Sequence, residues 1–231
     1  MLAGRIKHVM RDGKGFIESL EVFGSDLTVV NAARVSFNAE SVSLVQKDVN
    51  LLNYLARHNH ISPFFHPQVR FRISMPVFIT REWFRHNVGL SRNEISRRYV
   101  DSAPHCWVPP SPADVRERDA NIKQGSKHTP VMKADKAYDM MLKSVCDSAQ
   151  TYMGLLELGV APEVARSVLP QSMYTEFIET GSLYAYFRIC KLRTDPTAQA
   201  EVREYAQHIS QYLSLVFPNA WKALEGHQRG V

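Results

Sequence analysis

The chain has 231 residues, of which 45% are hydrophobic and 22% are charged, and it carries a formal net charge of +5. These values are typical of a globular protein with a sizeable core, and the positive charge favours anionic partners such as a nucleotide, a dinucleotide cofactor or RNA. No stretch approaches the roughly 18 apolar residues of a membrane span, and residues 1–16 lack the apolar region of a signal peptide. We therefore expect no membrane association and a cytoplasmic location, of a cell or of an infected host cell.

The N-terminal half predicts strands and short helices. Residues 5–22 are typical of short strands around the turn sequence DGKG, and residues 25–37 predict a helix capped by Ser25 or Asp26. A second helix is predicted over 48–58. Residues 68–75 alternate apolar and polar side chains, which indicates a half-buried strand, and a helix follows from residue 77 and runs into a loop.

The C-terminal half predicts helices. Residues 102–130 contain five prolines and few apolar residues, so we expect a long surface excursion there rather than a boundary between domains. Helical spacing covers about 132–158 up to Gly159, then 162–169, 182–192 and 198–217. The prediction is one domain over 1–231 with an α+β fold, strands mainly in the N-terminal half and helices mainly in the C-terminal half.

The most unusual segment is REWFRHNVGLSRNEISRRY, residues 81–99, which has five arginines and His86 but no lysine. Arginine binds phosphate oxygens in a bidentate manner, and neither a G-x-G-x-x-G nor a P-loop motif is present to do so. The pattern fits a phosphate or nucleotide site, an exposed basic face, or a nucleic-acid surface.

The histidines and cysteines give weaker signals. His58, His60 and His66 lie within nine residues, but their spacing is not that of a helical ligand pair and no cysteine or carboxylate is near in sequence. We expect a turn in which they pack, with a cofactor contact left open, and no metal. Three cysteines without a CxxC pair indicate reduced thiols, and Cys146 and Cys190 are expected in the core.

Residues 85–99, RHNVGLSRNEISRRY, resemble the signature of the flavin-dependent thymidylate synthases. AARVSF (32–37), HISPFFH (60–66), ARSVLP (165–170) and LRTDPTAQAE (192–201) resemble further blocks of that family in the same order. The residues that match the pattern S-x-N-E-x-S-x-R-Y are Ser91, Asn93, Glu94, Ser96, Arg98 and Tyr99. The resemblance implies a mixed α/β domain and a homotetramer whose active sites combine several subunits.

The activity implied by the resemblance is the reductive methylation of dUMP to dTMP. Methylenetetrahydrofolate would donate the one-carbon unit, and FAD, reduced by NADPH, would supply the hydride. Two alternatives stay open: a nucleic-acid-binding protein that uses the arginine cluster of residues 81–98, and an inactive relative that still binds a nucleotide. The resemblance implies no nucleic-acid partner, so the nucleic-acid-binding alternative depends on the basic segment alone.

The resemblance also implies roles for individual residues. Arg193 is expected to be catalytic, because a guanidinium at the uracil edge stabilises negative charge on the ring. The residues expected to bind dUMP are Glu82, Arg85, Glu94, Ser96, Arg97, Arg98, Arg166 and Arg193. The residues expected to bind FAD are Ser36, His60, Ser62, Arg85, His86, Asn87, Glu94, Ser182 and Arg188.

Several positions depart from the family pattern. Asn87 stands where the signature has arginine, and eight residues rather than seven separate it from Ser96, as one inserted residue within 88–90 would explain. Glu82 stands where a glutamine is common, which places a carboxylate near the uracil site. Phe65 and Thr197 occupy positions that often hold a carboxylate and a histidine. We expect a recognisable flavin pocket that is altered in detail.

Overall fold

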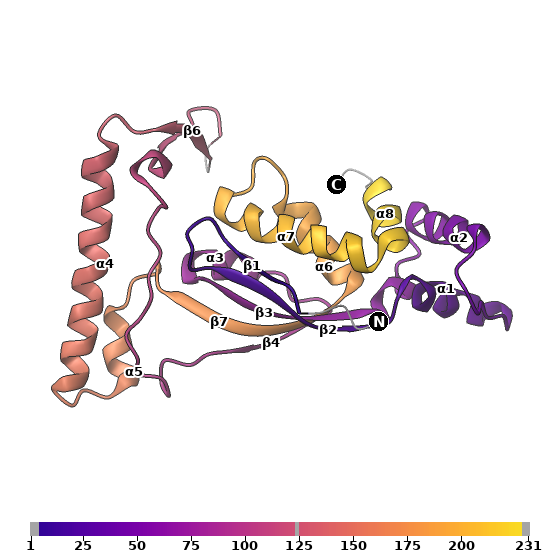
Figure 1. Cartoon of the computed structure of the whole chain (residues 1–231), viewed down its shortest axis with the longest axis horizontal. Helices are drawn as coiled ribbons and strands as arrows, with labels where there is room; N and C mark the ends of the chain where they lie inside the picture. Colours follow the sequence, from indigo (N-terminus) through magenta and orange to yellow (C-terminus); the bar gives the residue numbers. More distant parts are fainter. Residues whose placement is uncertain (1–4, 123–124, 228–231) are drawn as a thin grey trace.

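A five-stranded antiparallel sheet forms the centre of the molecule (Figure 1), in a computed structural model that describes residues 5–122 and 125–227. Its strand order is β1 (Lys7–Val9), β2 (Phe16–Phe23), β3 (Gln68–Pro76), β7 (Tyr174–Ser182) and β4 (Leu90–Glu94). Each neighbouring pair is antiparallel. β7 comes from the C-terminal half, was not predicted from the sequence, and joins the predicted strand β3 to β4.

The alternation predicted for residues 68–75 separates the two faces of β3. Val69, Phe71 and Ile73 are at most 1% exposed and face the helices, because successive side chains of a strand point to opposite sides. On the other face Arg70 pairs with Glu21 at 2.8 Å and Arg72 pairs with Glu176 at 2.5 Å. This second face is therefore polar in the single chain.

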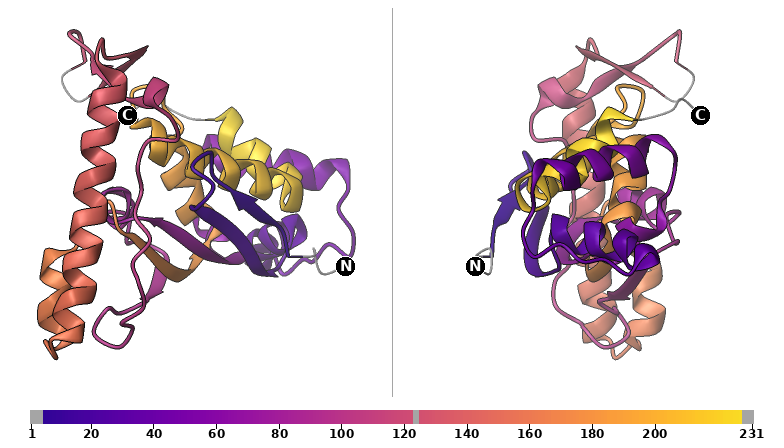
Figure 2. Two further views of the ribbon diagram at one scale, coloured as in Figure 1. Left: turned by 60° about the vertical axis from the view of Figure 1, so that its left-hand side comes forward. Right: turned by 90° about the vertical axis from the view of Figure 1, so that its right-hand side faces the viewer.

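Three C-terminal helices cover the apolar face of the sheet (Figures 1 and 2). They are α6 (Leu183–Arg193), α7 (Ala200–Val216) and α8 (Pro218–Gly226). The apolar stripe predicted for α7, including Val202, Tyr205 and Ile209, is buried as expected. Pro218 stands at the first position of α8, where its missing N–H is harmless, so it starts a helix that was not predicted.

Two helices close one end of the sheet. α1 (Asp26–Arg34) follows the N-cap residue Ser25, as predicted, and leads into the 3-10 turn η1 (Val35–Phe37). α2 (Gln46–Arg57) and the turn η2 (Ser62–Phe65) follow. Asp48 at the start of α2 accepts two bonds from Arg34 at the end of α1, at 3.0 and 2.6 Å. This buried pair fixes the angle between the two helices.

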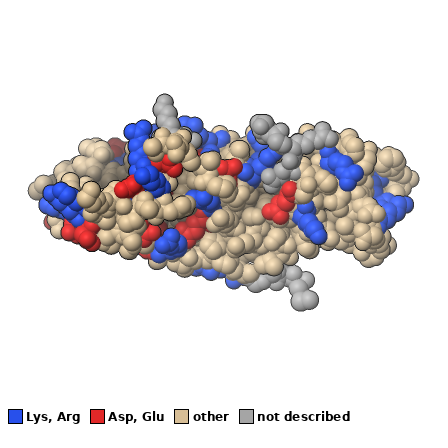
Figure 3. All heavy atoms as spheres, turned by 90° about the horizontal axis from the view of Figure 1, so that it is seen from above, with Lys and Arg blue, Asp and Glu red and all other residues tan. Residues whose placement is uncertain are grey.

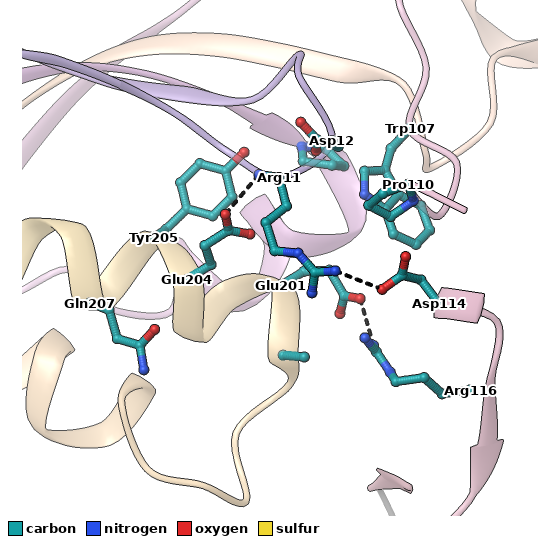
Figure 4. Close-up of a pocket in the computed structure, with 12 residues that line it drawn as sticks. Arg11, Asp12, Trp107, Pro110, Asp114, Arg116, Glu201, Glu204, Tyr205 and Gln207 are labelled. Atoms are coloured by element: carbon teal, nitrogen blue, oxygen red, sulfur yellow. Dashed lines mark hydrogen bonds and ion pairs between the residues drawn. The ribbon is translucent and has the colours of Figure 1, made fainter. Parts of the chain in front are cut away.

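The proline-rich excursion returns to the body of the protein. It contains η3 (Pro112–Asp114) and a hairpin of β5 (Arg116–Arg118) and β6 (Ser126–Pro130). Arg11 in the β1–β2 turn binds Asp114 at 3.2 Å, and Arg116 binds Glu201 of α7 at 2.6 Å (Figure 4). These contacts surround a cavity of about 200 Å³ that none of the predicted site residues lines.

The helix α4 (Ala134–Glu157) stands to one side of the sheet, followed by α5 (Pro162–Ala165) and η4 (Arg166–Val168) (Figures 1 and 2). Gly159, with φ of 83°, ends α4 as predicted. Tyr152 is the one buried residue of α4, so the prediction that Cys146 is a core residue is wrong, whereas Cys190 is buried. No helix within the described residues is long and apolar enough to cross a membrane.

Candidate active site

The arginine-bearing segment runs from a helix through a tight loop into a strand. α3 (Val77–Trp83) ends in the loop 84–89, and the residues beyond it, predicted as loop, form β4 at the edge of the sheet. Gly89 has φ of 77°, and a Cβ atom there would lie 3.0 Å from the hydroxyl of Ser182. Glycine is therefore required where the segment with the extra residue passes over the start of α6.

A buried ion pair anchors this segment to the sheet. Glu179 of β7 is 0% exposed and accepts a hydrogen bond from Nε of Arg92 in β4 and from the indole N–H of Trp83 at 3.2 Å. Burial raises the pKa of Glu179, and the Arg92 charge opposes that shift. No sequence pattern predicts this contact, because the two partners are 87 residues apart.

The first group of predicted residues lies where α3 and α6 end. Arg193 donates from Nε to Nε2 of His86 at 3.0 Å and from Nη1 to the carboxylate of Glu82. Burial, together with the charges of Arg193, Arg188 and Arg92, lowers the pKa of His86 to about 4. His86 is therefore a neutral acceptor at neutral pH, with its proton on Nδ1. Glu82 and Arg193 line a cavity of about 450 Å³.

The second group surrounds the residues that follow β4. Glu94, Ser96, Arg97 and Arg166 line a cavity of about 360 Å³. Arg97 donates to the backbone carbonyl of Ser102 at 2.5 Å, which orients the chain after the strand. The amide N–H of Arg98 donates to Oγ of Ser96 at 3.3 Å, and the guanidinium of Arg98 lies 3.6 Å from Glu163.

The third group lies between α1, α2 and η2. Ser36, His60 and Ser62 line a largely apolar cavity of about 820 Å³. Its wall also includes Lys47 and Tyr54, which were not predicted because single residues on a helix face carry no local motif. The ring of His60 stacks on Tyr54 with 6.1 Å between centroids, as expected for histidines that pack in a turn.

The remaining predicted residues have diverse surroundings. Arg85 and Asn87 are exposed on the loop 84–89, and the amide nitrogen of Asn87, turned toward the chain, donates to the carbonyl of Phe84 at 2.8 Å. Ser182 is 1% exposed and its hydroxyl accepts from the N–H of Ala185, as an N-cap of α6. Arg188 is exposed on α6, and its charge reaches His86.

Charged side chains of both signs are mixed on the face of the molecule that carries α7 and α8. Figure 3 shows lysines and arginines there in small groups, with aspartates and glutamates between them. Within residues 5–122 and 125–227, no group of three or more His, Cys, Asp or Glu side chains is placed to hold a metal ion.

These features define a class of protein: an α+β protein with arginine-bearing cavities suited to phosphorylated nucleotides. Residues 20–219 match the family described as thymidylate synthase complementing protein. Over 214 residues the chain is 37% identical to a flavin-dependent thymidylate synthase of Thermus thermophilus, covering 93% of this chain and 77% of that protein. Over 210 residues it is 39% identical to the corresponding protein of Thermotoga neapolitana, covering 91% and 90%.

Solved structures agree with the sequence comparisons. The crystal structure of PolB, a UMP/dUMP methylase from Streptomyces cacaoi bound with 5-Br dUMP, has a TM-score of 0.82 at 27% identity and covers 91% of this chain and 94% of that one. The chain belongs to the thymidylate synthase complementing protein family, and its α+β fold is confirmed. The nucleic-acid and inactive-relative alternatives find no support among these relatives.

Proposed function

We propose that this protein is a flavin-dependent thymidylate synthase that methylates dUMP to dTMP, with FAD as its cofactor and methylenetetrahydrofolate and NADPH as co-substrates. One observation carries the proposal beyond family membership: the side chain of Arg193, 81% buried, is held by Glu82 and by a neutral His86 at the wall of a cavity. A guanidinium fixed in this way is preorganised to stabilise negative charge that develops on a bound ring.

The phosphate of the nucleotide is assigned to the second group. Ser96, Arg97 and Arg166 present a hydroxyl and two guanidinium groups at one cavity, and Arg98 follows directly in the chain. A phosphate monoester accepts hydrogen bonds from such donors without needing any acceptor from the protein. The only carboxylate lining that cavity, Glu94, already accepts a bond from Thr175 at 2.6 Å.

The flavin is assigned to the third group. The cavity of about 820 Å³ offers the ring of Tyr54, the hydroxyls of Ser36 and Ser62, and the ammonium of Lys47, which suit an aromatic ring system attached to a charged pyrophosphate. When bound, the flavin carries two electrons from the reductant to the one-carbon unit. The chain itself would position the cofactor through Ser36, His60 and Ser62 and keep water from the apolar wall.

We also propose a homotetramer with shared active sites. The cavity of Arg193 and the cavity of Ser96 and Arg166 have no lining residue in common, so two groups that must hold one nucleotide are separate in a single chain. The exposed face of α4, where Met140 is 65% exposed, offers apolar surface for contact between copies. Within each subunit, residues 1–231 act as a single domain whose excursion, residues 102–130, is held by Arg11 and Arg116. Three free thiols fit a reducing cytoplasm.

The test uses purified protein reconstituted with FAD. We expect a bound flavin spectrum that survives removal of free FAD, and tritium release from 5-tritiated dUMP that requires methylenetetrahydrofolate and NADPH. Arg193→Ala should lower kcat by about 10²–10³ while retaining flavin, the size of effect seen when one transition-state donor is lost. A protein that retains no flavin and releases no tritium would refute the proposal.

A second variant separates binding from chemistry. Arg98→Ala should raise the KM for dUMP by roughly tenfold or more with a smaller change in kcat, since a hydrogen bond to a charged group contributes about 1.5–3 kcal/mol. If the KM is unchanged, the phosphate is bound elsewhere. Lys222→Ala in α8, remote in sequence from all three groups, is the matched control and should leave both constants unchanged.

A further inference from the structure

The Glu82–Arg193 pair presents both an acceptor and donors to one cavity. The Glu82 carboxylate side chain is 27% exposed and the Arg193 side chain 19%, so both reach the cavity of about 450 Å³ while remaining largely buried. Their mutual contact uses Nη1 of Arg193 and Oε1 of Glu82, and the contact to His86 uses Nε. Neither contact involves Nη2 of Arg193 or Oε2 of Glu82.

A phosphate is a poor ligand for this cavity. Its wall contains the carboxylates of Glu82 and Asp195, which would repel an anionic ligand, and the cations Lys191 and Arg193 only balance these two charges. Phosphate needs donors, and the cavity of Ser96 and Arg166 provides them beside a single lining carboxylate, Glu94, which already accepts a bond from Thr175. A carboxylate beside a guanidinium instead matches a ligand edge that carries both donors and acceptors, such as the edge of a nucleobase.

The order of donors and acceptors on the pair distinguishes the two pyrimidines. The edge of uracil presents O4, N3–H and O2, which are acceptor, donor and acceptor. The edge of cytosine presents N4–H, N3 and O2, which are donor, acceptor and acceptor. Glu82 followed by the remaining N–H groups of Arg193 offers acceptor, donor and donor, which complements cytosine at all three positions.

Uracil is matched less completely by a carboxylate. Glu82 accepts from N3–H and Arg193 donates to one carbonyl, but the second carbonyl of uracil then has no donor from Glu82, which when ionised only accepts. A glutamine at residue 82 would supply that donor through its amide nitrogen. The presence of glutamate therefore removes one hydrogen bond to uracil and gives a charge-assisted one to the amino group of cytosine.

We propose that Glu82 determines base specificity and that the site binds dCMP at least as tightly as dUMP. This inference rests on the proposed function, because it takes the ligand to be a pyrimidine nucleotide whose phosphate occupies the cavity of Ser96 and Arg166. His86 contributes by accepting from Nε of Arg193 at 3.0 Å, which fixes the plane of the guanidinium. Glu82 is the residue that sets which base fits that plane.

The experiment measures the Kd of dCMP and of dUMP by titration calorimetry on the FAD-loaded protein and on Glu82→Gln. In the wild-type protein the Kd of dCMP should equal or fall below that of dUMP. In the variant the ratio of the two constants should shift toward dUMP by about tenfold or more, the discrimination expected from one base-edge hydrogen-bond pair. Glu117→Gln, which alters a surface ion pair with Lys127 in the β5–β6 hairpin, is the control and should leave the ratio unchanged.

The outcomes separate this inference from the proposed function. If the wild-type protein converts dUMP but binds dCMP more than about tenfold more weakly, the role of Glu82 is refuted and the proposed function stands. An unchanged ratio in Glu82→Gln, with flavin retained, refutes it equally. If neither nucleotide binds to the FAD-loaded protein, both the inference and the proposed function are overturned.

Discussion

The Arg34–Asp48 pair gives the sharpest test of what holds the flavin cavity together. Asp48 is 0% exposed and Arg34 has 18% of its side chain exposed. Oδ1 of Asp48 accepts from Nε and Nη2 of Arg34 at 3.0 and 2.6 Å and from the hydroxyl of Ser41 at 2.9 Å, and Oδ2 accepts from the N–H of Val45 at 3.1 Å. Both hydrogen bonds from Arg34 of α1 to α2 therefore end on one carboxylate, which also binds two residues that precede α2 in the chain, Ser41 and Val45.

Asp48→Asn keeps the shape of the side chain but removes its charge. The new amide N–H groups would face the donors of Arg34, and a buried ion pair that loses one partner costs roughly 3–5 kcal/mol. Because Arg34 retains some contact with solvent, we expect a loss of about 3 kcal/mol in the free energy of unfolding. Urea unfolding followed by far-ultraviolet circular dichroism measures it, with Glu21→Gln as the control.

The control alters the exposed pair Arg70–Glu21, in which Glu21 has 67% of its side chain exposed. Exposed pairs contribute about 0–1 kcal/mol, so the two variants should differ by about 2 kcal/mol or more. Asp48→Asn should also lose bound FAD more readily, since Ala33 and Arg34 line the same cavity as Lys47. Equal unfolding midpoints in the two variants would refute the reasoning.

The Arg34–Asp48 pair also predicts that the free energy of unfolding depends on pH. Burial acts to raise the pKa of Asp48, but the hydrogen bonds from Arg34, from Val45 and from Ser41 outweigh it, and the pKa lies below its usual value. In the unfolded chain an aspartate has a pKa of about 3.9. The stabilisation is thus present above that value and is lost as pH falls through the lower folded value. In Asp48→Asn the free energy of unfolding, measured by urea titration, should change less with pH in the acidic range.

Three further predictions follow from single contacts. The pKa of His86 is about 4, so between pH 6.5 and pH 4 the unfolded chain binds a proton that the folded protein does not. The free energy of unfolding should therefore fall as pH falls across that window. An NMR titration of the His86 ring, assigned with His86→Asn, should show no midpoint near 6.5. Glu179→Ala leaves the guanidinium of Arg92 buried without its partner and should cost about 3–5 kcal/mol in urea unfolding, and a loss below 1 kcal/mol would contradict this. In Gly15→Ala the new Cβ would lie 2.1 Å from the hydroxyl of Tyr205, so we expect a loss of about 1–3 kcal/mol by thermal unfolding, and an unchanged Tm would contradict the packing seen here.

The part of the fold that follows from local pattern was predicted from the sequence. The alternation in β3 and the stripe on α7 were correct because one face of each element is buried against the same core. β7 was not predicted, since its inward positions include Glu179 and Gly181, which break an apolar alternation. Glu179 is acceptable there only because Arg92 and Trp83, distant in sequence, neutralise and bind it.

Other misses have equally physical causes. Pro218 predicted the end of α7 but not the helix it begins, because proline fits both situations. Cys146 lies on a helix with apolar residues at helical spacing, which indicates a covered face, yet in the part of the chain that the structure describes Cys146 is exposed. A pattern of this kind predicts that the helix face is covered, but it does not distinguish cover by the same chain from cover by another copy. For the site, motif residues were identified by resemblance, and their division into three groups is a property of the fold.

This division explains why one segment, residues 82–97, contributes to two cavities that differ in chemistry. Glu82 lies at the end of α3 and His86 in the loop 84–89, where they meet Arg193 and Arg188 from α6. Ser96 and Arg97 lie after β4 and meet Arg166 from η4. The strand β4, fixed by Glu179, keeps the two sets apart. The cavity of the first set is lined by two cations, Lys191 and Arg193, and by two carboxylates, Glu82 and Asp195, so its formal charges balance. A cavity without excess charge suits a neutral base edge, while the second set keeps its positive charge for the phosphate.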